Sequence, residues 1–207
     1  MTNSMQSQPL FDRAITEHLE VIRDLSAVRP ELETIATMMS DAILAGKKIF
    51  WFGNGGSAAD AQHLAAELVG RFRRERRALP SIALPTNTSI ITAIGNDYGY
   101  EHVFRRQVEA LCRAGDVVVG ISTSGNSPNV SSALKTARDL GAYAVAFTGE
   151  GGGTAAVAAD VALRIPSRDT ARIQEAHILC GHMLCDWIES SVCEVDREQD
   201  ACEAVAQ

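Results

Sequence analysis

Residues 48–57 have the sequence KIFWFGNGGS, in which a short apolar run leads directly into a glycine-rich turn. Four consecutive apolar residues bounded by glycine are typical of a strand that is buried on both faces. A helical pattern follows the turn at once, over residues 58–71. The stretch therefore predicts a strand, a tight loop and a helix, which is the opening of a βαβ unit.

The alternation of strand and helix continues on both sides of this stretch. Further strands are predicted at residues 81–84, 116–121, 142–147 and 161–165, and helices at residues 10–26, 30–45, 128–140 and 170–192, with another starting near residue 89. Such alternation predicts an α/β three-layer sandwich with a central, mostly parallel five-stranded sheet flanked by helices. In these folds ligands bind at the carboxyl ends of the strands, so we expect the functional residues in the loops there.

Composition limits the classes of protein that fit. The 207 residues are 46% hydrophobic and 22% charged, with a formal net charge of −7. This length predicts a single domain, and the acidic balance disfavours a dedicated nucleic-acid-binding protein, whose footprint is basic. No apolar run approaches the ~20 residues of a membrane span, and no secretory signal is visible at the start. We therefore expect a cytoplasmic protein with neither a membrane nor a nucleic acid as partner.

The domain is expected to span residues 10–194. Residues 1–9 are predicted to be a flexible N-terminal tail, and residues 195–207 a polar C-terminal tail. Five cysteines occur without any CxxC pair, which favours reduced, packed thiols over disulfides or a metal site. Five arginines within residues 71–77 are expected to lie in a solvated loop, with contact to an anion or a partner protein as the alternative.

Two loops at predicted strand ends carry candidate phosphate ligands. The first, residues 53–57, opens a helix whose free N–H groups suit an anion, although an ordinary turn explains it equally well. It is neither a Walker A loop nor a GxGxxG fingerprint. The second, residues 122–127 (STSGNS), brings four hydroxyls to one helix start, where a cap needs only one. Ser127 is predicted as the N-cap, with Pro128 at the first helical position.

Two helices carry further polar pairs. His63 and Glu67 are four residues apart and share one face of the helix that begins at the first loop. Gln174 and His182 are eight residues apart, a little over two turns, and share one side of the final helix. Pairs of this kind are common on solvated helix surfaces, so their spacing leaves a structural role open.

Four segments together resemble one family. Residues 53–63 are similar to the first phosphosugar loop of the SIS (sugar isomerase) domain, and in particular to that of the phosphoheptose isomerases, also called sedoheptulose 7-phosphate isomerases. Residues 92–100 (TAIGNDYGY), 120–127 (GISTSGNS) and 172–177 (RIQEAH) are similar to further signatures of that family, in the same order. The resemblance extends to about residue 194.

The resemblance implies a flavodoxin-like topology with N-terminal helices and a long C-terminal helix, and a homotetramer with active sites at subunit interfaces. It implies a ketose–aldose isomerase that converts sedoheptulose 7-phosphate to D-glycero-D-manno-heptose 7-phosphate. This reaction is the first step of heptose precursor synthesis for lipopolysaccharide or capsule. Zinc is implied in metal-bound members, and no nucleotide cofactor is implied.

Matching motif positions carries the family's site residues onto this chain. The implied acid/base pair is Glu67 and His182. The implied metal ligands are His63, Glu67, Gln174 and His182. The implied substrate-binding residues are Asn54, Gly55, Gly56, Ser57, Glu67, Asn96, Asp97, Ser122, Thr123, Ser124, Ser127 and Gln174.

The residue types suit the implied chemistry, because isomerisation through an enediol needs a carboxylate or an imidazole to move protons. Glutamine is an unusual zinc ligand, and a metal on Glu67 and His182 would compete with their acid/base roles, so the role of the metal stays open. One alternative is a non-catalytic SIS-domain regulator resembling the DnaA-binding protein DiaA. That branch lacks the acid and the histidine of the implied pair and carries an arginine where this chain has Gly125. The other alternative is an isomerase of a different phosphosugar.

Overall fold

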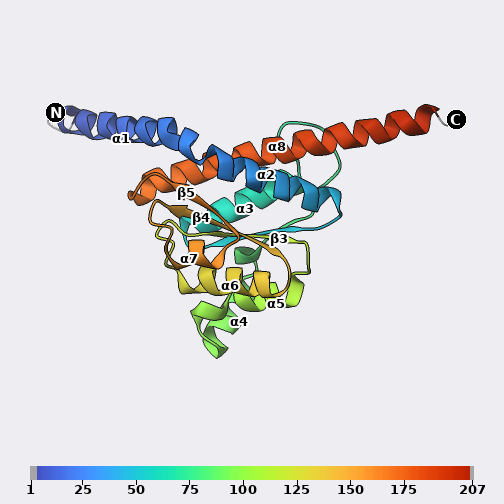
Figure 1. The fold of residues 1–207 in the computed structure, drawn as a ribbon. Coiled ribbons are helices and arrows are strands. Elements are labelled where there is room, and N and C mark those ends of the chain that lie inside the picture. Colours follow the sequence, from blue (N-terminus) through green and yellow to red (C-terminus); the bar gives the residue numbers. More distant parts are fainter. Residues whose placement is uncertain (1–3, 206–207) are drawn as a thin grey trace.

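The computed structural model describes residues 4–205 and contains a five-stranded sheet between two layers of helices (Figure 1). The strands are β1 (Ile49–Gly53), β2 (Ser81–Ala83), β3 (Val117–Ile121), β4 (Tyr143–Gly149) and β5 (Val161–Ile165). Their order in the sheet is β2-β1-β3-β4-β5, and every neighbouring pair is parallel. This confirms the predicted fold class and its flavodoxin-like strand order.

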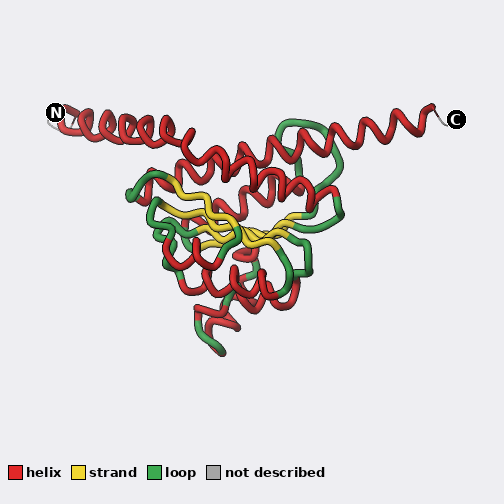
Figure 2. The backbone as a smooth tube through the Cα atoms, in the orientation of Figure 1, coloured by secondary structure: helices red, strands yellow, loops and turns green. Residues whose placement is uncertain are grey.

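The helices divide between the two faces of the sheet. Those on one side are α2 (Arg29–Leu44), α3 (Gly56–Val69) and α8 (Thr170–Val205), and those on the other are α5 (Arg105–Leu111), α6 (Pro128–Asp139) and α7 (Gly153–Ala158). The remaining two are α1 (Ser4–Asp24), which extends outward beside the start of α8, and α4 (Thr88–Asp97), which projects beyond α5 and α6 (Figures 1 and 2). Short 3₁₀ turns lie at Leu25–Val28, Leu84–Thr86 and Tyr100–His102.

Each face of the sheet has its own apolar core, because successive side chains of a strand point to opposite sides. Ile49 and Trp51 of β1 pack into the core shared with α2, α3 and α8. Phe50 and Phe52, which alternate with them, pack into the core shared with α5 and α6. All five residues of β1 are buried, which explains why the strand has an unbroken apolar sequence rather than an alternating one.

The centre of the sheet is a topological switch point. From β1 the chain moves outward to β2 and then returns to β3, on the other side of β1. Loops that leave the carboxyl ends of two such strands run in opposite directions and open a crevice between them. The two predicted phosphate loops, residues 53–57 and 122–127, are the loops that follow β1 and β3.

The outer helices are longer than the sequence pattern predicted. Helix α1 already begins at Ser4, and α8 continues past residue 192 to Val205. Residues 193–205 contain neither glycine nor proline, so no residue stops a helix that Glu, Ala, Arg and Gln favour. Parts of the predicted tails are therefore helical, while residues 1–3 and 206–207 lie outside the described residues. No helix between residues 4 and 205 has the length and apolar character to cross a membrane.

Candidate functional site

The first loop brings α3 and α8 together at the carboxyl edge of the sheet. Gly55 precedes α3 with a φ of +57°, a backbone conformation that favours glycine. The side-chain amide of Gln174 from α8 occupies the space that a β-carbon on Gly56 would take. The two glycines thus have different functions: Gly55 makes the turn, and Gly56 lets Gln174 reach the first turn of α3.

Asn54 is held by a reciprocal amide pair. Its Nδ2 donates to Asn129 Oδ1 at 3.0 Å, and Asn129 Nδ2 donates to Asn54 Oδ1 at 2.9 Å. The Tyr100 hydroxyl donates to the same oxygen at 3.2 Å. Asn129, which is 3% exposed, lies in the first turn of α6, so this pair links the two predicted loops. Sequence reasoning missed Asn129, although it stands two residues after the second loop.

The second loop presents hydroxyls that the helix does not use. Ser127 is the N-cap residue of α6 and Pro128 begins the helix, as predicted, but the Ser127 side chain makes no capping hydrogen bond. Its Oγ instead lies 2.9 Å from Ser122 Oγ. The prediction of Ser127 as a hydroxyl cap was therefore wrong, because its hydroxyl turns toward the loop. The hydroxyl pair lies at the start of α6, where the free N–H groups of a helix suit a phosphate.

Gly125 in the same loop has a φ of +68°. A β-carbon there would collide with the backbone carbonyl of Gly152, at the turn before α7. Backbone cannot move aside as the end of a flexible side chain can, so this loop conformation excludes a larger residue.

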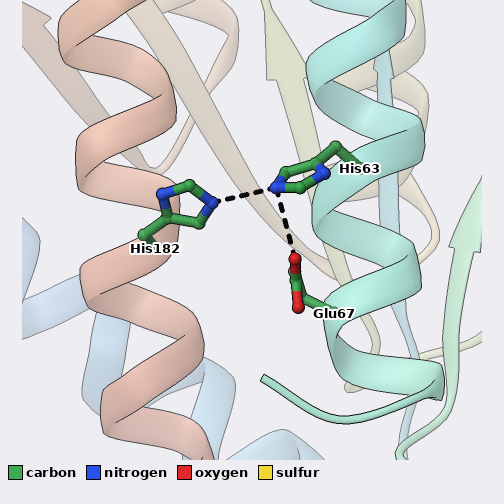
Figure 3. A group of neighbouring side chains, drawn as sticks. All are labelled: His63, Glu67 and His182. Carbon is green, nitrogen blue, oxygen red and sulfur yellow. Dashed lines mark hydrogen bonds and ion pairs between the residues drawn. The ribbon is translucent and has the colours of Figure 1, made fainter. Parts of the chain in front are cut away.

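A cluster of titratable side chains lies on the seam between α3 and α8 (Figure 3). His63 Nε2 lies 2.9 Å from His182 Nε2 and 3.3 Å from Glu67 Oε1. His63 is therefore the middle member, between the two residues implied as the acid/base pair. The side chain of His63 is 47% exposed and that of Glu67 is 21% exposed, so the cluster is open to a small molecule while remaining fixed by packing.

The surroundings of His182 favour its neutral form. Burial lowers the pKa of His182, the nearby His63 and Arg73 lower it further, and Glu67 opposes them. Burial also raises the pKa of Asp60, one turn before His63 on α3. A neutral imidazole can accept a proton and can also bind a metal ion, both of which the protonated ring cannot do.

Three of the four implied metal ligands come together in this cluster. One ligand atom from each of His63, Glu67 and His182 lies within 4.8 Å of the others. Imidazole nitrogens with a carboxylate oxygen form a donor set that zinc takes at catalytic sites, where a further position stays open. Gln174 lies beside Gly56, seven residues or about two turns before His63. The side chains of Gln174, His63, His182 and Glu67 thus follow the same seam, beginning at the first loop.

The structure places Asn96 and Asp97 apart from the other implied ligands. Both are exposed at the end of α4, where Asn96 Nδ2 donates to Asp97 Oδ1 at 2.8 Å. Within the part of the chain that the structure describes, no hydrogen bond joins either side chain to the two loops. Their nearest link is Tyr100, three residues further on, whose hydroxyl reaches Asn54.

The arginine loop, residues 70–80 between α3 and β2, is attached to α8, while the side chains of Arg71, Arg73 and Arg77 remain about half exposed or more, as expected of a solvated loop. The Arg76 side chain is 1% exposed, and its Nε lies 3.3 Å from Glu189 Oε1. Arg73 and Arg74 both donate to Asp186 on the same helix. The expectation of a solvated loop was wrong for Arg76. Its burial could not be predicted from the local sequence, because the acidic partners stand more than 100 residues later.

Four cysteines are free and buried: Cys112, Cys180, Cys185 and Cys193. Burial raises the pKa of both Cys180 and Cys185 to about 12, which favours the protonated form of a packed thiol. This confirms the prediction of packed thiols for these two residues.

Comparison with protein families and with curated proteins gives consistent matches. The model of the SIS domain family matches residues 11–149. The phosphoheptose isomerase of Aquifex aeolicus is 58% identical over 164 residues, which cover 79% of this chain and 86% of that protein. The phosphoheptose isomerase of Pelobacter propionicus is 56% identical over 192 residues, which cover 93% of this chain and 99% of that protein.

Solved structures give the same result. The phosphoheptose isomerase GmhA from Neisseria gonorrhoeae superposes with a TM-score of 0.83 at 45% identity, covering 88% of this chain and 98% of that one. A phosphoheptose isomerase from Francisella tularensis has a TM-score of 0.83 at 37% identity, covering 92% of this chain and 100% of that one.

Proposed function

Because this chain belongs to the phosphoheptose isomerases within the SIS domain family, we propose that it converts sedoheptulose 7-phosphate to D-glycero-D-manno-heptose 7-phosphate. The observation that carries this proposal is the cluster of His63, Glu67 and His182, whose reactive atoms lie within 4.8 Å of one another. The cluster lies on a seam that begins at the two loops of the switch point. A linear sugar phosphate fits such a site, with its phosphate at the loops and its reacting carbons along the seam.

The phosphate binds in the second loop. Its ligands are the side chains of Ser122, Thr123, Ser124 and Ser127, together with the N–H groups at the start of α6. The first loop and α8 hold the sugar hydroxyls through Asn54, Gly55, Gly56, Ser57 and Gln174. Support comes from the paired hydroxyls of Ser122 and Ser127 and from the amide pair that fixes Asn54, because both arrangements orient polar groups before a ligand arrives.

Glu67 and His182 move the protons. One of them removes a proton from C1 of the ketose, and the oxygen on C2 gains a proton to give an enediol. A proton is then delivered to C2 while the hydroxyl on C1 loses one, which leaves the aldehyde of the aldose. The neutral form of His182, favoured by burial, can accept the first proton, and His63 lies within hydrogen-bonding reach of both groups.

A zinc ion is the cofactor that the seam cluster suits. His63, Glu67 and His182 would hold it, with Gln174 of α8, whose side chain lies beside Gly56, as a fourth ligand. When bound, zinc would polarise a carbonyl or hydroxyl oxygen of the sugar. Because it would occupy Glu67 and His182, the chelator arm of the assay decides whether it assists their proton transfers or competes with them. The two imidazoles and one carboxylate at these separations support this proposal.

Subunits complete one another's sites in a homotetramer. Helix α1 exposes an apolar stripe that the chain itself leaves uncovered: Leu10, Phe11, Ile15 and Leu19 are 54–64% exposed. Met183 and Trp187 of α8 are also about half exposed. Contiguous apolar surface of this kind marks a protein interface. Helix α4 has no buried residue. In the homotetramer it would place Asn96 and Asp97 at the site of a neighbouring subunit.

An isomerase assay with sedoheptulose 7-phosphate tests the proposal. The assay is run with and without a chelator, and again after zinc is added back. Glu67→Gln and His182→Asn are expected to lower kcat by about 10²–10⁴-fold, the usual contribution of a positioned acid or base. Glu109→Gln on α5, which changes an exposed glutamate on the opposite face of the sheet, is the matched control and should retain full activity.

Three results would each contradict one part of the proposal. Full turnover by Glu67→Gln and His182→Asn would show that these two residues are not the acid and the base of the reaction. Absence of turnover by the wild-type protein under every metal condition would show that the protein does not catalyse this reaction. A saturable complex with the replication initiator would then support the regulator. Sedimentation that shows a stable monomer would contradict the homotetramer.

A further inference from the structure

A buried ion pair joins the arginine loop to α8. The Arg76 and Glu189 side chains are 1% and 0% exposed, and Arg76 Nε lies 3.3 Å from Glu189 Oε1. Ions removed from water need further hydrogen bonds to their remaining donors and acceptors. The groups that supply these bonds connect the pair to both members of the proposed acid/base pair.

Arg76 supports the helix that carries Glu67. Its Nη2 donates to the backbone oxygen of Glu67 at 2.9 Å, and its Nη1 donates to the backbone oxygen of Gly70 at 2.9 Å. The last carbonyl groups of a helix have no partner within the helix and attract positive charge. The guanidinium therefore fixes the end of α3 at the turn that carries Glu67.

Glu189 holds the loop that leaves this helix. Its carboxylate accepts backbone N–H bonds from Phe72 at 3.0 Å, from Arg73 at 2.8 Å and from Arg74 at 2.8 Å. Three donors on one buried carboxylate leave this segment little freedom. Glu189 stands seven residues, about two turns, after His182 on α8, so the loop is held against the helix that carries the catalytic histidine.

The Phe72 ring packs on the imidazole of His182. The two ring centroids are 5.3 Å apart, and the planes differ by only 15°. The Arg73 guanidinium lies over the same phenyl ring, 5.0 Å from its centroid. The residue that touches His182 is thus the one whose own N–H is held by Glu189.

We propose that Phe72 is a positioning residue, held by the Arg76–Glu189 pair, that aims His182 at His63 and Glu67. This inference rests on the proposed function, because the imidazole needs a fixed direction only if it transfers protons or binds a metal. Arg76 fixes the position of the end of α3. Glu189 fixes the backbone of Phe72, and the Phe72 ring in turn fixes the orientation of the His182 imidazole. The ion pair therefore determines the separation of two groups that come from different helices.

Phe72→Leu tests the stacking contact, because leucine retains an apolar side chain but has no ring face. We expect kcat for sedoheptulose 7-phosphate to fall about 10- to 100-fold with KM unchanged, since a small misplacement of a reacting group costs rate rather than binding. Phe72→Tyr keeps the ring and should restore most of kcat. Tyr143→Leu, which replaces a half-exposed aromatic residue at the opposite end of the sheet, is the matched control and should leave kcat unchanged.

A second measurement follows His182 directly and needs no turnover. In protein labelled with ¹³C-histidine, the ring current of Phe72 should displace the His182 resonances, and this displacement should disappear in Glu189→Gln. If Glu189→Gln does not fold, the double variant Arg76→Met with Glu189→Met replaces both buried ions by apolar side chains and is measured in its place.

The two measurements separate failure of this inference from failure of the proposed function. Wild-type kcat in Phe72→Leu would overturn the positioning role. If the wild-type protein itself does not isomerise the sugar, the proposed function fails, and the histidine resonances then decide. Loss of the ring-current displacement of the His182 resonances in Glu189→Gln would support the positioning role of Phe72, whereas a displacement that persists in this variant would overturn it.

Discussion

Leu64 of α3 packs its side chain over the α-carbon of Gly181 on α8, and a β-carbon at Gly181 would lie 2.5 Å from a methyl carbon of Leu64. Leu64 is fully buried, so it has no space into which to retreat. Each of these residues stands next to a histidine of the seam cluster, Leu64 after His63 and Gly181 before His182. The absence of a side chain at Gly181 therefore sets how closely the two imidazoles can approach.

Gly181→Ala should separate α3 from α8. We expect the free energy of unfolding to fall by about 1–3 kcal/mol, the usual cost of an extra methyl group in a packed core. The separation of His63 Nε2 from His182 Nε2, now 2.9 Å, should increase, and both kcat and zinc affinity should decrease. Urea denaturation, steady-state kinetics and calorimetric zinc titration measure the three quantities.

Gly151→Ala is the matched control, because a β-carbon at that position meets nothing within 4 Å. It should leave stability and kcat as in the wild-type protein. If Gly181→Ala behaves in the same way as Gly151→Ala, the close approach of the two helices does not determine the geometry of the cluster.

Gly56→Ala should displace Gln174 from the first turn of α3, since the new methyl group would occupy the place of the amide. We expect kcat/KM to fall about as far as it does in Gln174→Ala. The double variant should then lose no more than either single variant, because both changes remove one and the same contact. Additive losses in this double-mutant cycle, measured by steady-state kinetics, would show that Gly56 acts independently of Gln174.

The buried His177 should make folding stability depend on pH. Burial lowers the pKa of His177 from 6.5 to about 4, although a hydrogen bond to the Thr148 backbone oxygen opposes the shift. Between these two values the unfolded chain binds a proton that the folded chain does not. The stability is complete above pH 6.5 and is lost as the pH falls toward 4.

From pH 7 to pH 5 this difference amounts to about 2 kcal/mol, at 1.36 kcal/mol per pKa unit. Urea midpoints at the two pH values measure it, and the interval lies above the range in which carboxylates titrate. His177→Gln keeps an amide donor for Thr148 and should remove most of the pH dependence. An unchanged dependence in this variant would assign it to other groups.

The sequence predicted the centre of the sheet well because β1, β3 and nearly all of β4 are buried on both faces. A short unbroken apolar run such as Ile49 to Phe52 is typical of a buried parallel strand, and the glycines directly after it favour a strand over a buried helix and mark where it ends. Short helices were missed for the opposite reason. Helix α7 has six residues and begins at Gly153, and so short a segment carries no helical period in its sequence.

The candidate site was predicted less completely, because its supporting contacts join distant segments. His63 and Glu67 share a helix, so their spacing predicted their proximity. No local pattern links Arg76 to Glu189, which are 113 positions apart, or Asn54 to Asn129. Ser127 shows a further limit: its position at the start of α6 was predictable, but the direction of its hydroxyl depends on Ser122, which another part of the loop supplies.

Ser127→Ala should weaken phosphate binding without changing the fold. The Ser127 hydroxyl makes no capping bond and pairs with the Ser122 hydroxyl at 2.9 Å, so its loss should lower the free energy of unfolding by no more than about 1 kcal/mol, the net contribution of a typical hydrogen bond. A hydrogen bond to a charged group contributes about 1.5–3 kcal/mol, so KM for sedoheptulose 7-phosphate should rise by at least tenfold, and inorganic phosphate should inhibit less.

Ser131→Ala, one turn further along α6, is the control: Ser131 Oγ lies 2.7 Å from Thr154 Oγ1 and belongs to the helix rather than to the loop. An equal rise of KM in both variants would mean that the second loop does not hold the phosphate through Ser127, whereas a rise confined to Ser127→Ala would identify its hydroxyl as a phosphate ligand.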